Sequence, residues 1–579
     1  MRKKVLKVQL VSIGPWGRMG LFVLSLALGL EIGDSAIAQT RPDAGSLMRQ
    51  LELSLPAPKL PDVGPPSPPP KVEMLVGTGD TLTVENFEFS GNLAVRSAEL
   101  QKRLSPYLGR PLHFEDLQNA AAEISLFYRS FGLIAAASIP KQTVTDGIVR
   151  IDIVEARFSG AEIDPQSTGR ADSELIRNHI ESALPPGRMV NVYDLDRALL
   201  LLNDLPGVSV TGGLRSGSEN GETAMVVVSN PKPLISGSLL MDNFGSASTG
   251  TTRFVASANS NGAMGLGDLV SVSGNKSEGS DQGQLSLSVP LGSYGTKFTL
   301  ATSAMNYRII SGQFSSGSFT GTSQSVSADL QHAIIRSRSA NLYGQSTLHA
   351  KWFNNLSSGS ATSTYQVTSL SSAMRGNLHD DFMGGGQTDA SIGITVGYVN
   401  LSGSANESSD ASGPRTAGAY TKFTYALSRT QTMTPDFSLS AKLNGQYALK
   451  NLDSSEKLYL GGAEGIRAYP SSEGGGSSGY RAALEADYVF GFGVKGKSFV
   501  DTGTVKQYID NNFSGSATTN DLTYSGFGLG FVYEPTSQLS LQGLWSRRLG
   551  TNPYPQSDGS DQDGTLLVDR FWFSGQINF

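Results

Sequence analysis

Residues 437–447 read FSLSAKLNGQY, and apolar or small side chains alternate there with polar ones along the whole stretch. Successive side chains of a β-strand point to opposite faces, so this stretch predicts a strand with one lipid-facing side and one wet side. Similar stretches occur at residues 284–291, 480–490 and 539–545, and Gly, Ser, Asn and Asp separate them. Alternation over about ten residues with such breaks is typical of strands in a transmembrane β-barrel.

The segment 234–579 holds 346 residues. At roughly 20 to 24 residues per strand and connection, it accommodates about 16 strands, an even number that leaves both ends on one side of the membrane. The last nine residues, FWFSGQINF, alternate and end on Phe579, which resembles the signal that delivers bacterial barrels to their assembly machinery. We therefore predict a mainly β fold with a 16-stranded antiparallel transmembrane barrel at residues 234–579.

A secreted β-sandwich or adhesin is the soluble alternative, because it would also be rich in Gly, Ser and strands. The terminal aromatic strand, the strand lengths near ten residues and the lack of a repeat period argue against it.

The N-terminus has the pattern of an export signal. Five basic residues precede the apolar run 19–30, and the small residues AIA follow at 36–38. We expect residues 1–38 to be a signal peptide cleaved after Ala38. The run is short of the about 20 residues that a spanning helix needs. Since no later stretch offers such a helix, an integral membrane protein of this sequence must be a closed β-barrel.

A short helix and a stiff spacer follow the signal. Leu47, Met48 and Leu51 recur at spacings of three and four, and Asp43 is available as the N-cap, which predicts an amphipathic helix within residues 39–55. Residues 56–70 contain eight prolines. We interpret residues 56–77 as an extended, polyproline-like linker that leaves the helix free to dock at a distance.

Residues 78–157 and 158–233 predict two copies of one small α/β module. In the first, a strand and two helices precede two further strands, with Gly132 ending the second helix. In the second, two helices and two strands recur in the same order. The runs RSFGLIAAASIP (129–140), DGIVRIDIVEARF (146–158) and LNDLPGVSVTGGLRSGS (202–218) resemble a tandem pair of POTRA domains, the periplasmic modules of outer-membrane translocators.

Composition excludes several function classes. A net charge of -6 without a basic cluster argues against nucleic acid, and the absence of cysteine excludes disulfides and thiol chemistry. GFGVKGKS at residues 491–498 satisfies a phosphate-loop pattern, but FVDTG follows it as a strand would, so a short hairpin is expected there. We expect no catalytic residues, no metal, no cofactor and no enzymatic activity.

Three further segments extend the resemblance over nearly the whole mature chain: MDNFGSASTG (241–250), LYLGGAEGIRAY (458–469) and SFVDTG (498–503). Together they resemble a two-partner secretion transporter of the haemolysin and filamentous-haemagglutinin exporter type. The resemblance implies a helix that plugs the pore, two periplasmic POTRA domains, and a barrel in the outer membrane of a Gram-negative bacterium. It also implies a secreted exoprotein as partner, with outer-membrane lipid and the barrel assembly machinery as further partners.

The resemblance also implies the candidate site, an extracellular loop that folds into the barrel. The loop tip is Ile466, Arg467, Ala468 and Tyr469, the loop base is Gly461 and Gly462, and the barrel wall contributes Phe499, Asp501 and Gly503. A cation and an anion inside a barrel are expected to pair with each other. Ala468 replaces the family's usual glycine, so a positive φ at the tip would be strained.

Two other functions are open at this point. One is a barrel-assembly or insertase role within the same superfamily, although its members usually carry more POTRA domains and lack the plug helix and proline spacer. The other is a passive porin, which has no reason for such periplasmic modules.

Overall fold

The computed structural model describes residues 42–54, 60–64, 80–219, 221–312 and 314–579. The predicted signal peptide and most of the predicted linker lie outside the described residues. Among the described residues, no helix combines the length and apolar character that crossing a membrane requires. The first element is α1 (Ala44–Ser54), which begins after Asp43, whose carboxylate accepts a hydrogen bond of 2.8 Å from the backbone of Ser46.

The first α/β module contains a three-stranded sheet in the order β2-β5-β4, with β2 parallel to β5. Its elements are β1 (Leu82–Thr83), β2 (Asn86–Ser90), α2 (Ser97–Arg103), β3 (Pro111–Leu112), α3 (Phe114–Ser130), β4 (Ala135–Ser138) and β5 (Ile148–Glu155). Val149, Ile151 and Ile153 alternate along β5 and pack against α2 and α3 in one core. Gly132 has φ +76° just after α3, as its position at the helix end predicted.

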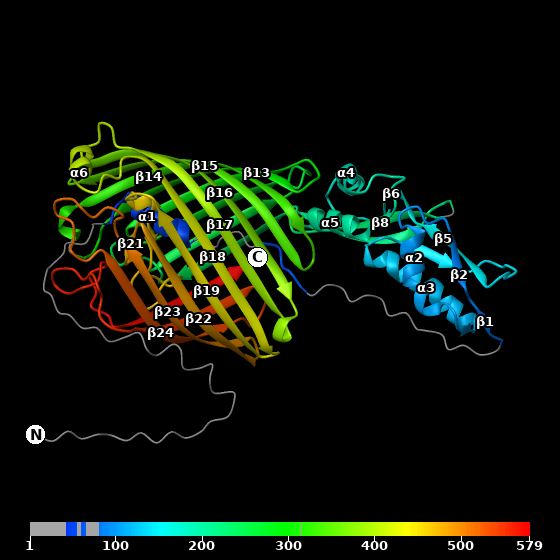
Figure 1. Cartoon of the computed structure of the whole chain (residues 1–579). Helices are drawn as coiled ribbons and strands as arrows, with labels where there is room; N and C mark the ends of the chain where they lie inside the picture. Colours follow the sequence, from blue (N-terminus) through cyan, green and yellow to red (C-terminus); the bar gives the residue numbers. More distant parts are fainter. Residues whose placement is uncertain (1–41, 55–59, 65–79, 220, 313) are drawn as a thin grey trace, which may run out of the picture.

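The second module repeats this topology with sheet order β6-β8-β7 and β6 parallel to β8. Its elements are β6 (Arg157–Ile163), α4 (Ser173–Ala183), α5 (Val192–Asn203), β7 (Val208–Ser216) and β8 (Glu222–Pro231). The strand β6, whose buried residues include Phe158 and Ala161, was absent from the sequence prediction of this module. Figure 1 shows both modules beyond one end of a barrel, which we call the near end.

The rest of the chain confirms the predicted barrel, which is closed by 16 antiparallel strands. The strands are β9 (Ile235–Asp242), β10 (Arg253–Asn261), β11 (Leu269–Lys276), β12 (Ser280–Leu291), β13 (Thr296–Arg308), β14 (Phe319–Arg336), β15 (Ala340–Ser357), β16 (Ser360–Asp380), β17 (Gly386–Asn400), β18 (Gly418–Thr434), β19 (Phe437–Ala448), β22 (Ser478–Gly491), β23 (Val494–Lys506), β24 (Asp521–Tyr533), β25 (Leu539–Arg548) and β26 (Asp569–Asn578). β26 pairs with β9 and closes the barrel. Two residues separate β22 from β23, so the phosphate-loop pattern at 491–498 is a hairpin turn and its following strand.

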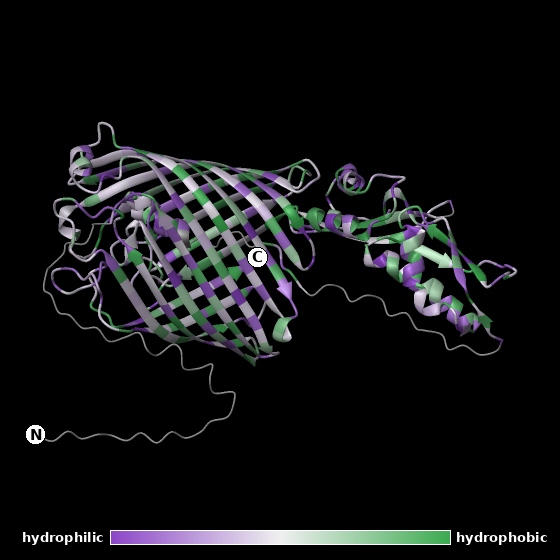
Figure 2. Cartoon of the chain, in the orientation of Figure 1, coloured by the Kyte–Doolittle hydropathy of each residue, from purple (hydrophilic) through white to green (hydrophobic). Residues whose placement is uncertain are grey.

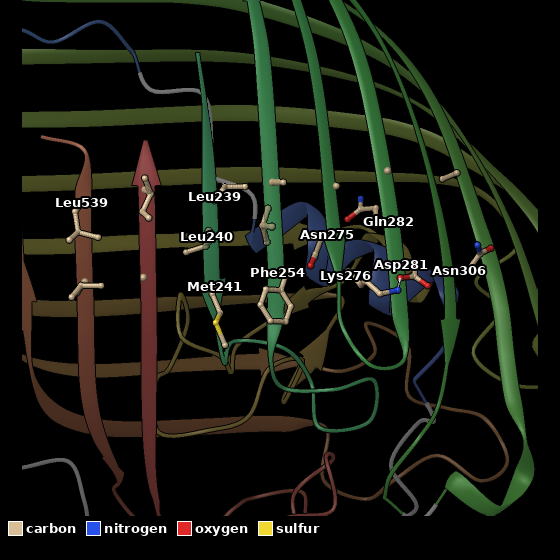
Figure 3. A pocket seen from close by; sticks show the side chains of 18 residues that line it. Leu239, Leu240, Met241, Phe254, Asn275, Lys276, Asp281, Gln282, Asn306 and Leu539 are labelled. Atoms are coloured by element: carbon tan, nitrogen blue, oxygen red, sulfur yellow. Dashed lines mark hydrogen bonds and ion pairs between the residues drawn. The ribbon is translucent and has the colours of Figure 1, made fainter. Parts of the chain in front are cut away.

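The outer wall of the barrel is apolar. Along β26, Phe571, Phe573 and Ile577 are each more than half exposed, and Figure 2 shows hydrophobic and hydrophilic residues alternating along the strands. An apolar hollow of about 870 Å³ lies beside the β26–β9 closure, around the small residues of β10–β13. Figure 3 shows Leu239 and Phe254 among the side chains that line it. An apolar outer band of this kind matches lipid chains.

The inner wall is less uniformly polar than the alternation predicted. At the far end of the barrel, inward apolar and aromatic residues pack around α1 in one buried cluster, so these positions are not wet. The cluster consists of Ala44, Leu47, Met48 and Leu51 of α1 with Met305, Tyr307, Ile309, Phe353, Tyr365, Val367, Val399, Leu401, Tyr420, Ala448 and Leu452. The reason is that α1 brings its own apolar face into the lumen, and that face needs apolar partners.

Candidate functional site

The loop between β19 and β22 folds back into the barrel. Two short strands, β20 (Leu458–Tyr459) and β21 (Gly475–Gly476), pair with each other inside the lumen. The segment between them carries the sequence-predicted tip, of which Ala468 and Tyr469 are fully buried. The inward position of this loop places Arg467 against the barrel wall at β23.

Arg467 and Asp501 form a buried ion pair. Nε and Nη2 of Arg467 donate to the two carboxylate oxygens of Asp501 at 2.9 and 2.6 Å, and the backbone N–H of Arg467 donates to the same carboxylate at 3.1 Å. The guanidinium also lies 3.4 Å from the ring centroid of Phe499. The carbonyl of Arg467 accepts from Ser546 Oγ at 2.6 Å and from Trp572 Nε1 at 2.7 Å. The tip is therefore held through both its side chain and its backbone.

Glu485 on β22 is a third charged partner that the sequence analysis did not single out. Its carboxylate lies 2.9 Å from Nη1 of Arg467 and also pairs with Lys442 and Lys497 at 2.8 and 2.9 Å. Glu485 lies directly opposite Phe499 in the β22–β23 register. A sequence feature that indicates Glu485 is its inward position on an alternating strand, next to the strand that carries Asp501, because a charge inside a barrel needs a partner.

Ala468 does not take a positive φ, so the expected strain at the tip is absent. Its methyl group instead occupies space that Gly526 of β24 leaves open, because a Cβ on Gly526 would lie 2.5 Å from Cβ of Ala468. Tyr469 packs edge-on against Tyr524, with ring centroids 4.8 Å apart.

The glycines of the candidate site allow close backbone approach. Gly462 has φ +117°, and a Cβ on Gly461 would lie 2.2 Å from the carbonyl oxygen of Pro470. On the barrel wall, a Cβ on Gly503 would lie 3.1 Å from Cδ1 of Ile466. The structure thus brings the predicted tip, residues 466–469, against the predicted wall residues Phe499, Asp501 and Gly503, whereas Gly461 and Gly462 pack within the loop itself.

The helix α1 lies in the lumen beside this loop and packs against the inner wall. The Ser454 hydroxyl donates one bifurcated hydrogen bond to the carboxylate of Asp43, 2.9 Å from either oxygen, and the backbone N–H of Ala44 donates to Oδ1 of Asn355 at 2.8 Å. Further along the helix, Glu52 pairs with Lys351 of β15 at 2.8 Å. The same lysine belongs to a buried charge group with Glu456 and Lys422.

Two features show how closely α1 and the inward loop share the lumen. Ser472, in the loop, donates a hydrogen bond of 2.7 Å to Gln50 of α1. Beside α1, the remaining lumen contains a cavity of about 530 Å³, lined mainly by hydroxyl, amide and charged side chains of β12–β18. A movement of either element therefore changes the surroundings of the other.

The acidic run 557–564 is partly buried, with Ser560, Asp561 and Asp563 turned away from solvent. Asp561 is almost fully buried and pairs with Arg548 and with Arg570, the latter at 2.9 Å. Asn552 donates to both Asp561 and Glu473, at 2.8 and 2.9 Å. The last loop thus covers the base of the inward loop, and the reason is this buried arginine–carboxylate network.

Comparison with known protein families decides the class of this barrel. The model for the haemolysin secretion/activation proteins ShlB/FhaC/HecB matches residues 221–531, and the model for the ShlB-type POTRA domain matches residues 82–156. The chain belongs to the haemolysin secretion/activation protein family. As a member of this family, it is a two-partner secretion transporter that moves an exoprotein across the outer membrane, with POTRA domains in the periplasm.

Individual relatives agree with the family. The heme/hemopexin transporter protein HuxB of Haemophilus influenzae (strain 86-028NP) is 25% identical over 575 residues, which cover 96% of this chain and 98% of HuxB. The outer membrane transporter CdiB of Dickeya dadantii (strain 3937) is 22% identical over 410 residues, or 69% of this chain and 71% of CdiB. The solved structure of CdiB from Escherichia coli has a TM-score of 0.70 and 17% sequence identity, and the match covers 94% of this chain and 100% of that structure.

Membership of the haemolysin secretion/activation family orients the molecule. The near end of the barrel, next to the POTRA domains, is the periplasmic end, and the far end is extracellular. The N-terminus of α1 thus lies towards the extracellular mouth, and its C-terminus points to the periplasm.

Proposed function

We propose that this transporter is held closed by α1, the plug helix, and by the inward loop, and that an unfolded exoprotein opens it by binding to the POTRA domains. The observation that carries the proposal is the buried Arg467–Asp501 pair. Removing one partner of such a pair leaves a buried charge unpaired, at a cost of about 3 to 5 kcal/mol. That cost opposes the apolar packing and the hydrogen bonds that also hold the loop, and it weakens the hold on its tip.

Recognition of the exoprotein is proposed to occur by strand addition to a POTRA sheet edge. In the second POTRA domain, the start of the β6 edge, residues 156–158, is covered by backbone bonds to residues 187–190. The opposite edge strand, β7, has residues 211–216 exposed. Backbone pairing there would tolerate varied sequences, which suits a partner that arrives as an extended chain through its N-terminal secretion domain.

The transport step that we propose needs no nucleotide hydrolysis. The chain would pass through the lumen in extended form after the plug helix leaves, and folding outside the cell would supply the direction. The polar wall of β12–β18 supports this proposal, because hydroxyl and amide groups can solvate a passing backbone.

The test replaces Arg467 with alanine in the full-length transporter, co-expressed with its cognate exoprotein. We expect the barrel to insert normally, judged by its heat-dependent mobility on a denaturing gel, while secretion of the exoprotein falls at least about ten-fold. The control is Arg375→Ala, which removes a partly buried arginine of β16 that is remote from the inward loop. Secretion that is undiminished in Arg467→Ala would overturn the assigned role.

A further inference from the structure

Five residues of the linker, 60–64, lie against the periplasmic ends of β14–β16. The carbonyl of Pro61 accepts two hydrogen bonds, from Nδ2 of Asn341 at 3.1 Å and from Nδ2 of Asn377 at 3.0 Å. The backbone N–H of Gly64 donates to the carbonyl of Arg338 at 2.9 Å. The linker is therefore attached to the barrel at one defined point between the plug helix and the first POTRA domain.

The two asparagines are fixed by a third residue. Asn341 also donates to Oδ1 of Asn377 at 2.9 Å, and its own Oδ1 accepts from Nη1 of Arg336 at 3.1 Å. Asn341 and Asn377 are each 4% exposed. If Pro61 left, buried amide donors would lose their acceptor, which is unfavourable. We call Arg336, Asn341 and Asn377, together with the Pro61 carbonyl, the linker clamp.

The linker clamp is joined directly to the second POTRA domain. Nε and Nη2 of Arg336 donate to the two oxygens of Asp204, at the end of α5, at 2.7 and 2.9 Å. Beside this pair, Leu60 of the linker packs on a small cluster formed by Leu201 of α5 with Ala333 and Tyr343 of the barrel. One continuous network therefore runs from the POTRA domain through the barrel to the linker.

The plug helix can leave its position without opening the clamp. Lys351, which pairs with Glu52, lies ten residues along β15 from Asn341, a distance of about 33 Å. Pro61 follows Glu52 by nine residues, which span at most about 32 Å between Cα atoms in any direction from the clamp, so the linker has almost no slack while the helix is docked. A helix that moves towards the periplasm thus stays within reach while Pro61 remains bound.

We propose that the linker clamp keeps Pro61 bound to the barrel during transport. The linker thereby holds the displaced plug helix near the pore. This attachment depends on docking of the second POTRA domain. Arg336, Asn341, Asn377 and Asp204 are positioning residues in this scheme. A short tether keeps the effective concentration of the helix at the pore high, so the pore recloses quickly. The inference rests on the proposed function, because it assumes that the plug helix leaves the lumen.

The first experiment measures open dwell times of the full-length transporter in planar lipid bilayers. Asn341→Ala/Asn377→Ala leaves the linker only the Gly64 backbone bond and the packing of Leu60, and once these open, the next attachment among the described residues is β1, which begins 30 residues after Glu52. Effective concentration falls as about the −3/2 power of tether length, so open times should lengthen on the order of five-fold. Asp204→Asn should also lengthen the open times.

The matched control is Gln345→Ala, which removes an inward amide of β15 that bonds to Asp329 and not to the linker. Its open times should equal those of the parent. Open times that are unchanged in the double variant would overturn the tether. Open times that are unchanged in Asp204→Asn would overturn its dependence on the POTRA domain.

The second experiment separates the tether from the proposed function. Because the natural chain has no cysteine, Pro61→Cys/Asn377→Cys can be joined selectively by a short thiol crosslinker. Secretion should continue, since the clamp stays closed, and blocked secretion would overturn the inference. Gly45→Cys/Ser454→Cys fixes the plug helix itself, because a Cβ on Gly45 lies 2.5 Å from Oγ of Ser454. That crosslink should stop secretion, and if it does not, plug release and with it the proposed function fail.

Discussion

Ala468 illustrates how one substitution is accommodated by a residue far away in the chain. The resemblance placed a glycine at this position, and a side chain there would be strained only if φ were positive. In the structure φ is not positive, and the methyl group fits over Gly526 of β24. The sequence could predict the loop tip and its charge partner, but not this contact, because nothing local links residues 468 and 526.

We expect Gly526→Ala to displace the loop tip, because the added Cβ would lie 2.5 Å from Cβ of Ala468. Overpacking of this kind costs typically about 1 to 3 kcal/mol. Hydrogen–deuterium exchange of peptides from the loop, residues 460–476, should therefore become faster. The double variant Ala468→Gly/Gly526→Ala should regain most of the protection. Equal exchange in the single and double variants would show that the two residues do not determine the position of the tip.

At the scale of elements, the sequence predicted the helix α1 and the alternating strands, but not where the apolar face of α1 would lie. Alternation assigns apolar residues to the lipid side, and inward residues such as Tyr307, Phe353 and Tyr365 break that rule only because α1 covers them. A pattern of this kind within one strand cannot reveal a helix that arrives from outside the barrel. The same limit hid Glu485, whose role depends on the loop tip that it contacts.

The charged contacts of α1 should help to hold it in the lumen. In Glu52→Gln, Lys351 keeps only Glu456 as an anionic partner, at 3.4 Å, and a hydrogen bond to a charged group is worth about 1.5 to 3 kcal/mol. We expect the fraction of time that the pore is open in planar bilayers to rise about ten-fold or more. Glu123→Gln, which breaks an ion pair with Arg103 in the first POTRA domain, is the control and should leave the open fraction unchanged. An unaltered open fraction in Glu52→Gln would mean that apolar packing alone retains the helix.

At the scale of the whole molecule, the barrel and the POTRA domains differ in how their sheets end. Every barrel strand is paired on both sides, whereas each POTRA sheet has three strands and two edges. The 16 strands were predictable because strand length and chain length fix their number. The docking of α5 on the barrel through Asp204 and Arg336 was not, because both residues are ordinary charged residues in their local sequence.

The contrast between the closed barrel and the open POTRA sheets predicts two separate unfolding transitions in detergent. The helical signal, which comes mainly from α2–α5 of the POTRA domains, should be lost on heating well before the β signal of the closed barrel.

Arg336→Met removes the partner of Asp204 and leaves its carboxylate without the bidentate pair. If the loss is about 1 kcal/mol, the first transition should fall by about 4 to 8 °C for a domain of this size. The second transition should stay in place, because the barrel ladder is intact. Circular dichroism at two wavelengths measures both, and a single joint transition that shifts as a whole would show that the POTRA domains and the barrel unfold as one unit.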